Sequence, residues 1–118
     1  MTSPADLAAL LRRGRFSLST EAEAQADIEG FLTGHGISFE REFRLTKEDR
    51  LDFLVDGGIV IEVKMNRTSP AQIAAQVARY ARHEKTEAVI LVSNRALVLP
   101  PTIEGKPAFF VSMGRAWL

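Results

Sequence analysis

The chain has 118 residues, of which 46% are hydrophobic and 25% charged, and its formal net charge is zero. This length and composition predict one soluble globular domain and exclude a disordered or fibrous protein. Because the chain has no cysteine and only two histidines, disulfides and thiolate-bound metals are excluded and a metal site would use oxygen ligands, which favours Mg²⁺ or Mn²⁺.

Two helices are predicted in the first third of the chain. Residues 4–13 carry leucines at helical spacing after a proline, and a glycine ends this segment. Ser19, Thr20 and Glu23 then form a capping-box pattern, which starts a helix that runs to about residue 35.

Three strands are predicted next. Residues 37–45 alternate apolar and polar side chains, with Arg41 breaking the series, and residues 51–55 and 59–65 are rich in β-branched and apolar residues. The tripeptide Asp56-Gly57-Gly58 indicates a tight turn, because glycine tolerates positive φ. We therefore expect an antiparallel meander whose second hairpin is closed by this turn.

A helix and further strands complete the prediction. Ser69 and Pro70 start a helix that runs to about residue 83, and the apolar run 87–93 is typical of a strand covered on both faces. A helix between two strands gives a parallel crossover. We expect short strands at 96–99 and 108–112. The predicted fold is a single α/β domain with a mixed β-sheet flanked by helices, composed of an N-terminal helix (1–15), an αβββαβ core (19–93) and a C-terminal β extension (94–118).

The predicted hairpin brings two acidic side chains and a lysine together. On the third strand, Glu62 and Lys64 share a face because side chains alternate along a strand. In the register centred on the turn, Asp52 lies opposite Glu62 or a residue nearby. Like charges opposed across a ladder destabilise it unless a cation compensates them, and Lys64, Arg50 or a divalent metal ion would do so. A solvated Glu and Lys on an amphipathic strand is the ordinary alternative.

Two carboxylates and a lysine are what phosphodiester hydrolysis needs. The carboxylates hold a Mg²⁺ that neutralises the phosphate and lowers the pKa of bound water, and the lysine orients the attacking water or stabilises the transition state. In the first turn of the second helix, Glu21 shares a face with apolar residues and can reach inward as a third carboxylate, with Glu23 and Glu29 as rivals for that role.

The helix after the third strand adds further candidates. Gln76 and Tyr80, four residues apart, share a face beside Arg79 and could bind the phosphate or orient a catalytic group, unless Tyr80 is simply a core aromatic. Charge is also segregated: residues 19–63 carry a net charge of −7 and residues 64–118 a net charge of +5. This suits a site with a cation on one wall and phosphates on the other, although two solvated surfaces would explain it equally well.

These residues together resemble the PD-(D/E)XK nuclease superfamily. Its pattern is a helical Glu, an Asp, a turn, Glu-x-Lys and a helix with Gln-x-x-x-Tyr. In this chain the pattern reads TEAEAQADIEGFLTGHGI, RLDFLVDGGIVIEVK and QVARY, over about residues 20–93. The stretch TEAEAQ looks like the start of the VRR-NUC branch, and QVARY looks like the RecB-like branch. Leu51 stands where the family's name has proline.

The resemblance implies a restriction-endonuclease-like fold and a Mg²⁺- or Mn²⁺-dependent nuclease, acting as an endonuclease on DNA, with RNA not excluded. The site residues it implies are Asp52, Glu62, Lys64, Glu21, Gln76 and Tyr80 for catalysis, Asp52, Glu62, Val63 and Glu21 for the metal, and Arg67, Arg79 and Arg82 for nucleic acid. The alternative is a module with the same fold that binds nucleic acid or assembles without cleaving. A third possibility is a structural protein with a surface Glu-Lys pair.

The sequence also gives expectations about partners and location. No stretch is long enough to span a membrane, and no basic residue precedes the N-terminal apolar run, so we expect a cytoplasmic protein without membrane contact. Few residues lie outside the predicted core. A homo-oligomer is therefore expected, with residues 1–15 or 100–118 supplying the contact.

Overall fold

The computed structural model describes residues 2–65 and 68–113. Every main element predicted between residues 4 and 93 is present, with bounds that differ by at most a few residues. In chain order the elements are α1 (Pro4–Arg12), α2 (Glu21–Gly34), β1 (Phe39–Arg44), β2 (Arg50–Val55), β3 (Ile59–Lys64), α3 (Pro70–Arg82), β4 (Ala88–Ser93), β5 (Thr102–Ile103) and β6 (Lys106–Ser112).

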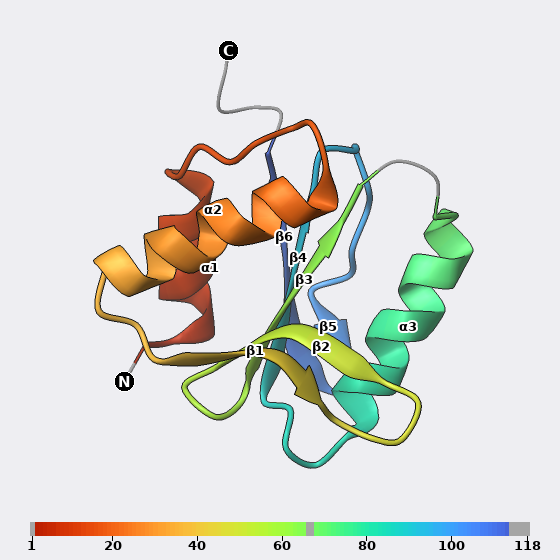
Figure 1. Ribbon diagram of the computed structural model, residues 1–118. Helices are drawn as coiled ribbons and strands as arrows, with labels where there is room; N and C mark the ends of the chain where they lie inside the picture. Colours follow the sequence, from red (N-terminus) through yellow and green to blue (C-terminus); the bar gives the residue numbers. More distant parts are fainter. Residues whose placement is uncertain (1, 66–67, 114–118) are drawn as a thin grey trace.

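The strands form one mixed sheet in the order β1-β2-β3-β4-β6-β5 (Figure 1). The first three strands are an antiparallel meander, and α3 connects β3 to a parallel partner, β4. The predicted meander and crossover are therefore confirmed. The C-terminal β extension is an integral part of the sheet, because β6 lies parallel to β4 and pairs with it from Val89↔Ala108 to Ser93↔Ser112.

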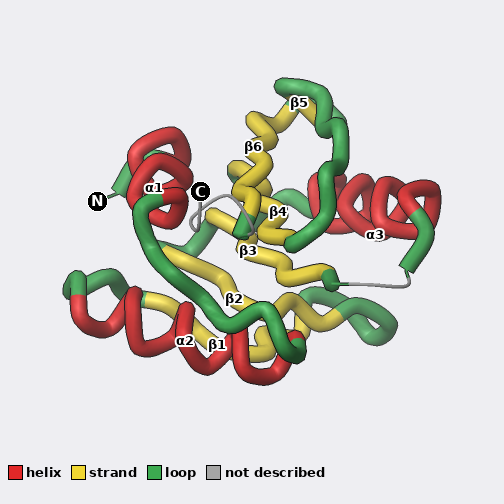
Figure 2. The backbone as a smooth tube through the Cα atoms, turned by 90° about the horizontal axis from the view of Figure 1, so that it is seen from above, coloured by secondary structure: helices red, strands yellow, loops and turns green. Residues whose placement is uncertain are grey.

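Helices cover both faces of the sheet, with α1 and α2 on one side and α3 on the other (Figures 1 and 2). The larger core joins the apolar stripes of α1 and α2 to one face of the sheet, and the smaller core joins α3 to the other face. Leu7, Ala8 and Leu11 of α1 are fully buried in the larger core, so the apolar side of the N-terminal helix is occupied within the chain itself.

The prediction of a strand at 96–99 is wrong. Leu97 and Leu99 do alternate with exposed residues, because both pack against the core beneath α3, while Val98 between them is 97% exposed. This segment is nevertheless a loop, and it leads into two prolines, which have no N–H to offer a neighbouring strand. Strand pairing begins only after them, where Thr102 lies opposite Pro107.

The turn between β2 and β3 has the expected position, but only one of its two glycines has a positive φ. Positive φ occurs at Asp56 and Gly57, as in the hairpin turns with two left-handed central residues, and not at Gly58. Gly58 instead lies close to Glu87. Its carbonyl accepts a 2.7 Å hydrogen bond from the Glu87 amide, and a Cβ at this position would lie 2.8 Å from the Glu87 side chain.

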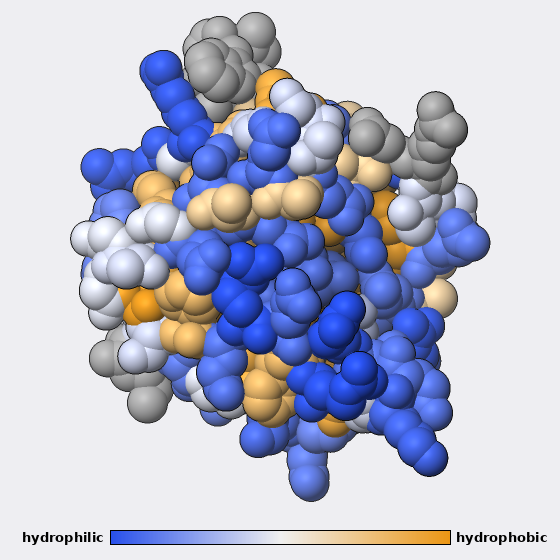
Figure 3. Space-filling model, in the orientation of Figure 1, coloured by the Kyte–Doolittle hydropathy of each residue, from blue (hydrophilic) through white to orange (hydrophobic). Residues whose placement is uncertain are grey.

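The outer strand pair is irregular where Glu42 faces Asp52. The β1–β2 ladder skips this pair, and Glu42 has a φ of +50°. On one side of it Phe53 faces the α1–α2 core, and on the other side Leu51 faces the α3 core, although simple alternation would place both on one face. Hydrophilic side chains predominate over β1 and β2 at the front of Figure 3.

Candidate functional site

The β2–β3 ladder ends just before the residues that the sequence singles out. Its last regular pair is Phe53↔Ile61, in the register that the sequence predicts. Beyond it, side chains replace the backbone partners: the Asp52 amide donates to Glu62 Oε1 at 3.1 Å, and the Val63 amide donates to Asp52 Oδ2 at 2.7 Å. The two strands thus separate, and both carboxylates are held in the gap by backbone amides.

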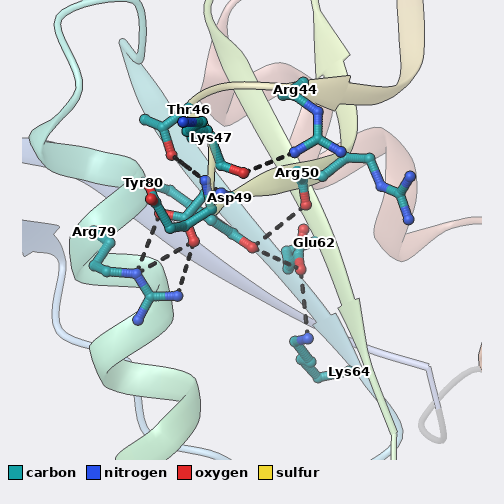
Figure 4. A network of polar contacts seen from close by, with 10 residues as sticks. Arg44, Thr46, Lys47, Asp49, Arg50, Glu62, Lys64, Arg79 and Tyr80 are labelled. Atoms are coloured by element: carbon teal, nitrogen blue, oxygen red, sulfur yellow. Dashed lines mark hydrogen bonds and ion pairs between the residues drawn. The ribbon is translucent and has the colours of Figure 1, made fainter.

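Two further side chains contact Glu62, which is only 2% exposed. The Lys64 ammonium lies 3.5 Å from Glu62 Oε2, and the Tyr80 hydroxyl of α3 donates to the same oxygen at 3.5 Å (Figure 4). Tyr80 is itself buried, and the Arg50 carbonyl, also 3.5 Å from its hydroxyl, is a second acceptor for the same single proton. Glu62, Lys64 and Tyr80 are therefore brought together, as the sequence predicts. Tyr80 is at once a core aromatic and a polar partner of Glu62.

Among the three rival glutamates of α2, Glu21 is the one that reaches this end of the sheet. Its Oε2 accepts a 2.9 Å hydrogen bond from the Met65 amide, just after β3. Glu23 accepts from the Ser17 hydroxyl, and Glu29 pairs with Arg41 at 2.7 Å, so both are occupied elsewhere. The N-cap Thr20 accepts from the Glu23 amide, which fixes the first turn of α2 and with it Glu21.

A polar cleft of about 400 Å³ opens in front of Asp52, Glu62 and Lys64. Gln76 and Tyr80 of α3 line it, as expected for a pair four residues apart on one helix face. Its lining contains more acids than bases, and the expected arrangement of a cation on one wall and phosphates on the other stays a prediction. The remaining lining residues are Gln25, Glu42, Glu48, Asp49, Arg50, Leu51 and Arg79.

Burial dominates the electrostatics of the acid pair. Loss of solvent raises the pKa of Asp52 to about 6, although the Val63 amide and Lys64 act in the opposite direction. The pKa of Glu62 is raised to about 8 by burial and by the neighbouring charge of Asp52, against the opposing charge of Lys64. The pair therefore retains a proton near neutral pH. Burial also raises the pKa of Tyr80, which keeps its hydroxyl protonated and able to donate.

The acid pair fits a hard cation of the Mg²⁺ type. Buried carboxylates with raised pKa values gain most from a cation, and Asp52 Oδ1 has no hydrogen bond to any residue of 2–65 or 68–113. Within those ranges, no three His, Asp or Glu side chains are gathered closely enough to hold a metal. Mg²⁺ commonly binds through one or two carboxylates and keeps several waters, so the pair suffices for it.

The three arginines predicted to bind nucleic acid have different surroundings. Arg79 lines the cleft and pairs with Asp49 at 2.9 Å. Arg82, one turn later on α3, is not in the cleft lining and pairs with Glu104 at 3.3 Å, and its contact with nucleic acid stays a prediction. Arg67 lies outside the described residues. Arg50 does not neutralise Asp52 as expected, because it extends toward Glu42 at 3.8 Å.

Two residues near the site escape sequence reasoning. Asp49 lies in a loop that the sequence marks only as a turn, and its partner is 30 positions away. Arg41 interrupts the apolar alternation of β1 because it faces α2, where it donates to Glu29 and Gln25 and stacks over the Phe53 ring. An arginine at an inward strand position was the available signal, but its partners depend on how α2 docks.

Comparison with protein-family models, with curated proteins and with solved structures finds no match for this chain. None of the helices in the described ranges is long and apolar enough to cross a membrane. What can be said of function therefore depends on the site itself.

Proposed function

We propose that this chain is a metal-dependent nuclease that hydrolyses phosphodiester bonds in DNA as an endonuclease, and that its sheet and helices are a restriction-endonuclease-like core of the PD-(D/E)XK superfamily. The observation that carries the proposal is the open end of the β2–β3 hairpin. There, Asp52 and Glu62 are held together by backbone amides beside Lys64, at the floor of a polar cleft.

Asp52 and Glu62 would hold Mg²⁺ or Mn²⁺, with Val63 and Glu21 as the further ligand candidates. Val63 is in direct contact with Asp52, and Glu21 is close enough for its charge to raise the pKa of Asp52. When bound, such a cation supplies neutralisation of the phosphate and a lowered pKa of the attacking water. Before that, the protein must hold the buried Glu62 and the half-buried Asp52 close together, which the amides and Lys64 make possible.

The side chains of the chain itself have separate tasks in the hydrolysis. Water attacks phosphorus, a phosphorus–oxygen bond breaks, and the leaving oxygen gains a proton. Lys64 is placed to orient the water or to stabilise the charge that develops on the phosphate, since its ammonium lies 3.5 Å from Glu62 Oε2. Tyr80 orients Glu62 through its hydroxyl, and Gln76 lines the same wall of the cleft.

The test is cleavage of labelled single-stranded, duplex and branched DNA in Mg²⁺ or Mn²⁺. We expect wild-type protein to cut at least one of these substrates, and Lys64→Ala to lose activity. The matched control is Lys85→Ala, which removes a lysine that lies over the Phe43 ring and outside the cleft lining. If Lys64→Ala cuts as fast as wild type, the proposed mechanism fails.

One observation favours a second candidate, a module that binds nucleic acid or assembles without cutting. Within the described ranges, no set of three acidic or histidine side chains is gathered around one point. Such a module would bind DNA in the same test and leave it intact in both metals. Self-association is a further part of the proposal, and native mass measurement of a stable monomer would contradict it.

A further inference from the structure

An ion pair joins the two sides of the cleft above the acid pair. Arg79 on α3 donates to Asp49, in the loop before β2, from Nε at 3.2 and 3.3 Å and from Nη2 at 2.9 Å (Figure 4). Both residues line the cleft that contains Asp52 and Glu62. The contact is bidentate, which fixes the plane of the guanidinium as well as its position.

Asp49 is the fixed member of this pair. Its side chain is 11% exposed, against 48% for Arg79. The loop around it is closed by hydrogen bonds: its amide donates to Thr46 Oγ1 at 3.0 Å, and its carbonyl accepts from the Leu45 amide at 2.9 Å. A rigid, nearly buried carboxylate thus orients an exposed guanidinium, whose long side chain would otherwise sample many rotamers.

The guanidinium retains a second edge for binding. Arginine has five N–H donors in a planar fork, and Asp49 occupies only the edge formed by Nε and Nη2. Among residues 2–65 and 68–113, Asp49 is the only hydrogen-bond partner of Arg79, so Nη1 remains open. The edge formed by Nη1 and Nη2 matches two oxygens of a phosphate.

The other two bases of the cleft are less suited to this role. Lys64 is 17% exposed and belongs to the acid pair through its contact with Glu62. Arg50 lies 3.8 Å from Glu42, a distance beyond a hydrogen bond, and both side chains are 57% exposed. Arg79 alone combines an open edge with a fixed orientation. Figure 4 shows its guanidinium beside Asp49 and apart from Glu62 and Lys64.

We propose that the open edge of Arg79 binds a phosphate of the nucleic-acid strand other than the one at Asp52 and Glu62, and that Asp49 is the positioning residue that orients it. This inference rests on the proposed nuclease function. It deepens that function, because a second phosphate contact would recognise the nucleic-acid backbone whatever its sequence.

The test measures cleavage of labelled DNA in Mn²⁺ at several DNA and salt concentrations, which separates kcat from KM. For Arg79→Ala we expect a KM raised several-fold, an unchanged kcat, and a salt dependence of 1/KM that is weaker by about one unit of logarithmic slope, the effect of one lost phosphate contact. Lys85→Ala is the matched control: it removes a cation just after α3 that lies outside the cleft lining, and it should leave KM unchanged.

Asp49 gives the sharper test, because charge alone predicts the opposite result. Removing an acid from the cleft should strengthen DNA binding by simple electrostatics. If Asp49 positions Arg79, Asp49→Ala raises KM, and Asp49→Asn raises it less because one acceptor oxygen remains. In protein that already carries Arg79→Ala, Asp49→Ala should raise KM no further.

The outcomes separate this inference from the nuclease proposal. If wild-type protein cuts DNA and Arg79→Ala leaves KM unchanged, or if Asp49→Ala lowers KM, the inference is wrong and the nuclease proposal stands. An equal rise of KM in Lys85→Ala would also overturn it, because the effect would then reflect the general positive charge near α3. If wild-type protein cuts no DNA, both proposals fall.

Discussion

The β2–β3 hairpin has two ends that differ in almost every physical respect. At the closed end, three successive ladder pairs from Val55↔Ile59 to Phe53↔Ile61 are apolar and buried, and their backbone groups bond to each other. At the open end, one residue further on, Asp52 and Glu62 replace apolar side chains, and carboxylates replace the ladder carbonyls as partners of the amides.

The difference shows how a small sheet can hold two acids together. Burial of the closed end favours folding, whereas the open end places two like charges in a poorly solvated gap and so opposes it. The closed end fixes the register, and the register brings Asp52 to Glu62. We therefore expect substitutions at the closed end to change stability, and substitutions at the open end to change activity and pH dependence.

The largest expected effect is on cleavage, from Asp52→Asn. The amide oxygen can still accept from Val63, so folding should be preserved, but the charge that attracts a cation is lost. We expect the cleavage rate in Mg²⁺ or Mn²⁺ to fall at least about 100-fold, with the unfolding temperature unchanged or higher. Asp56→Asn makes the same change at the closed end, and its cleavage rate should equal that of wild type.

Next in size is the effect of Ile61→Ala on stability. Ile61 is fully buried in the larger core, and truncation would leave a cavity that costs about 2–5 kcal/mol of unfolding free energy. Urea denaturation measures it, and Ile61→Val should cost only about 0.5–1.5 kcal/mol. A loss for Ile61→Ala as small as that of Ile61→Val would mean that the closed end does not hold the hairpin.

A further effect is expected on the pH dependence of stability in metal-free protein. Asp52 and Glu62 bind a proton more tightly when folded, with pKa values of about 6 and about 8 against ordinary values of 3.8 and 4.5. Their contribution is therefore complete below about pH 4 and is lost as the pH rises through 6 and 8.

Thermal unfolding in EDTA from pH 8 to pH 5 tests this. The unfolding temperature of wild-type protein should rise on acidification relative to the double variant Asp52→Asn, Glu62→Gln, which lacks both titrating groups. Addition of Mg²⁺ or Mn²⁺ at pH 8 should stabilise wild type alone. If the unfolding temperatures of the two proteins change with pH in parallel, burial does not raise the pKa values of the acid pair.

The smallest expected effect comes from the turn. Gly57 has a φ of +78°, where an alanine is strained, so Gly57→Ala should cost about 1 kcal/mol in urea denaturation. Gly58→Ala keeps an ordinary φ, and the nearest atoms to its Cβ belong to the exposed Glu87 side chain, which can move, so it should cost less. A larger loss of unfolding free energy for Gly58→Ala than for Gly57→Ala would show that the turn depends more on the glycine at position 58.

The closed end was predictable from sequence and much of the open end was not. Alternation and turn chemistry act locally, so they specify the strands, the turn and the register that opposes Asp52 and Glu62. The same alternation was misleading at Leu97 and Leu99. A loop that packs every second side chain against a core has the same alternation of apolar and exposed residues as a strand.

Contacts between distant elements explain the rest. The sequence favours Glu21 over its rivals Glu23 and Glu29 without deciding between them, since the choice depends on how α2 lies across the sheet, and of the three it is Glu21 that accepts from the Met65 amide. Asp49 and Arg79 meet because the loop before β2 folds against α3. No spacing rule relates residues that far apart in the chain, so neither the pair nor the open edge of Arg79 could be foreseen.

The distorted position at Glu42 has a consequence for the behaviour of the protein in concentrated solution. β1 is the outermost strand of the sheet, and a regular edge strand offers its free backbone groups to another copy, which is a common route to aggregation. Here Glu42 departs from strand geometry at mid-edge, and Glu40, Glu42 and Arg44 are all exposed. The irregular backbone at Glu42 should thus make this edge a poor template for the addition of further strands.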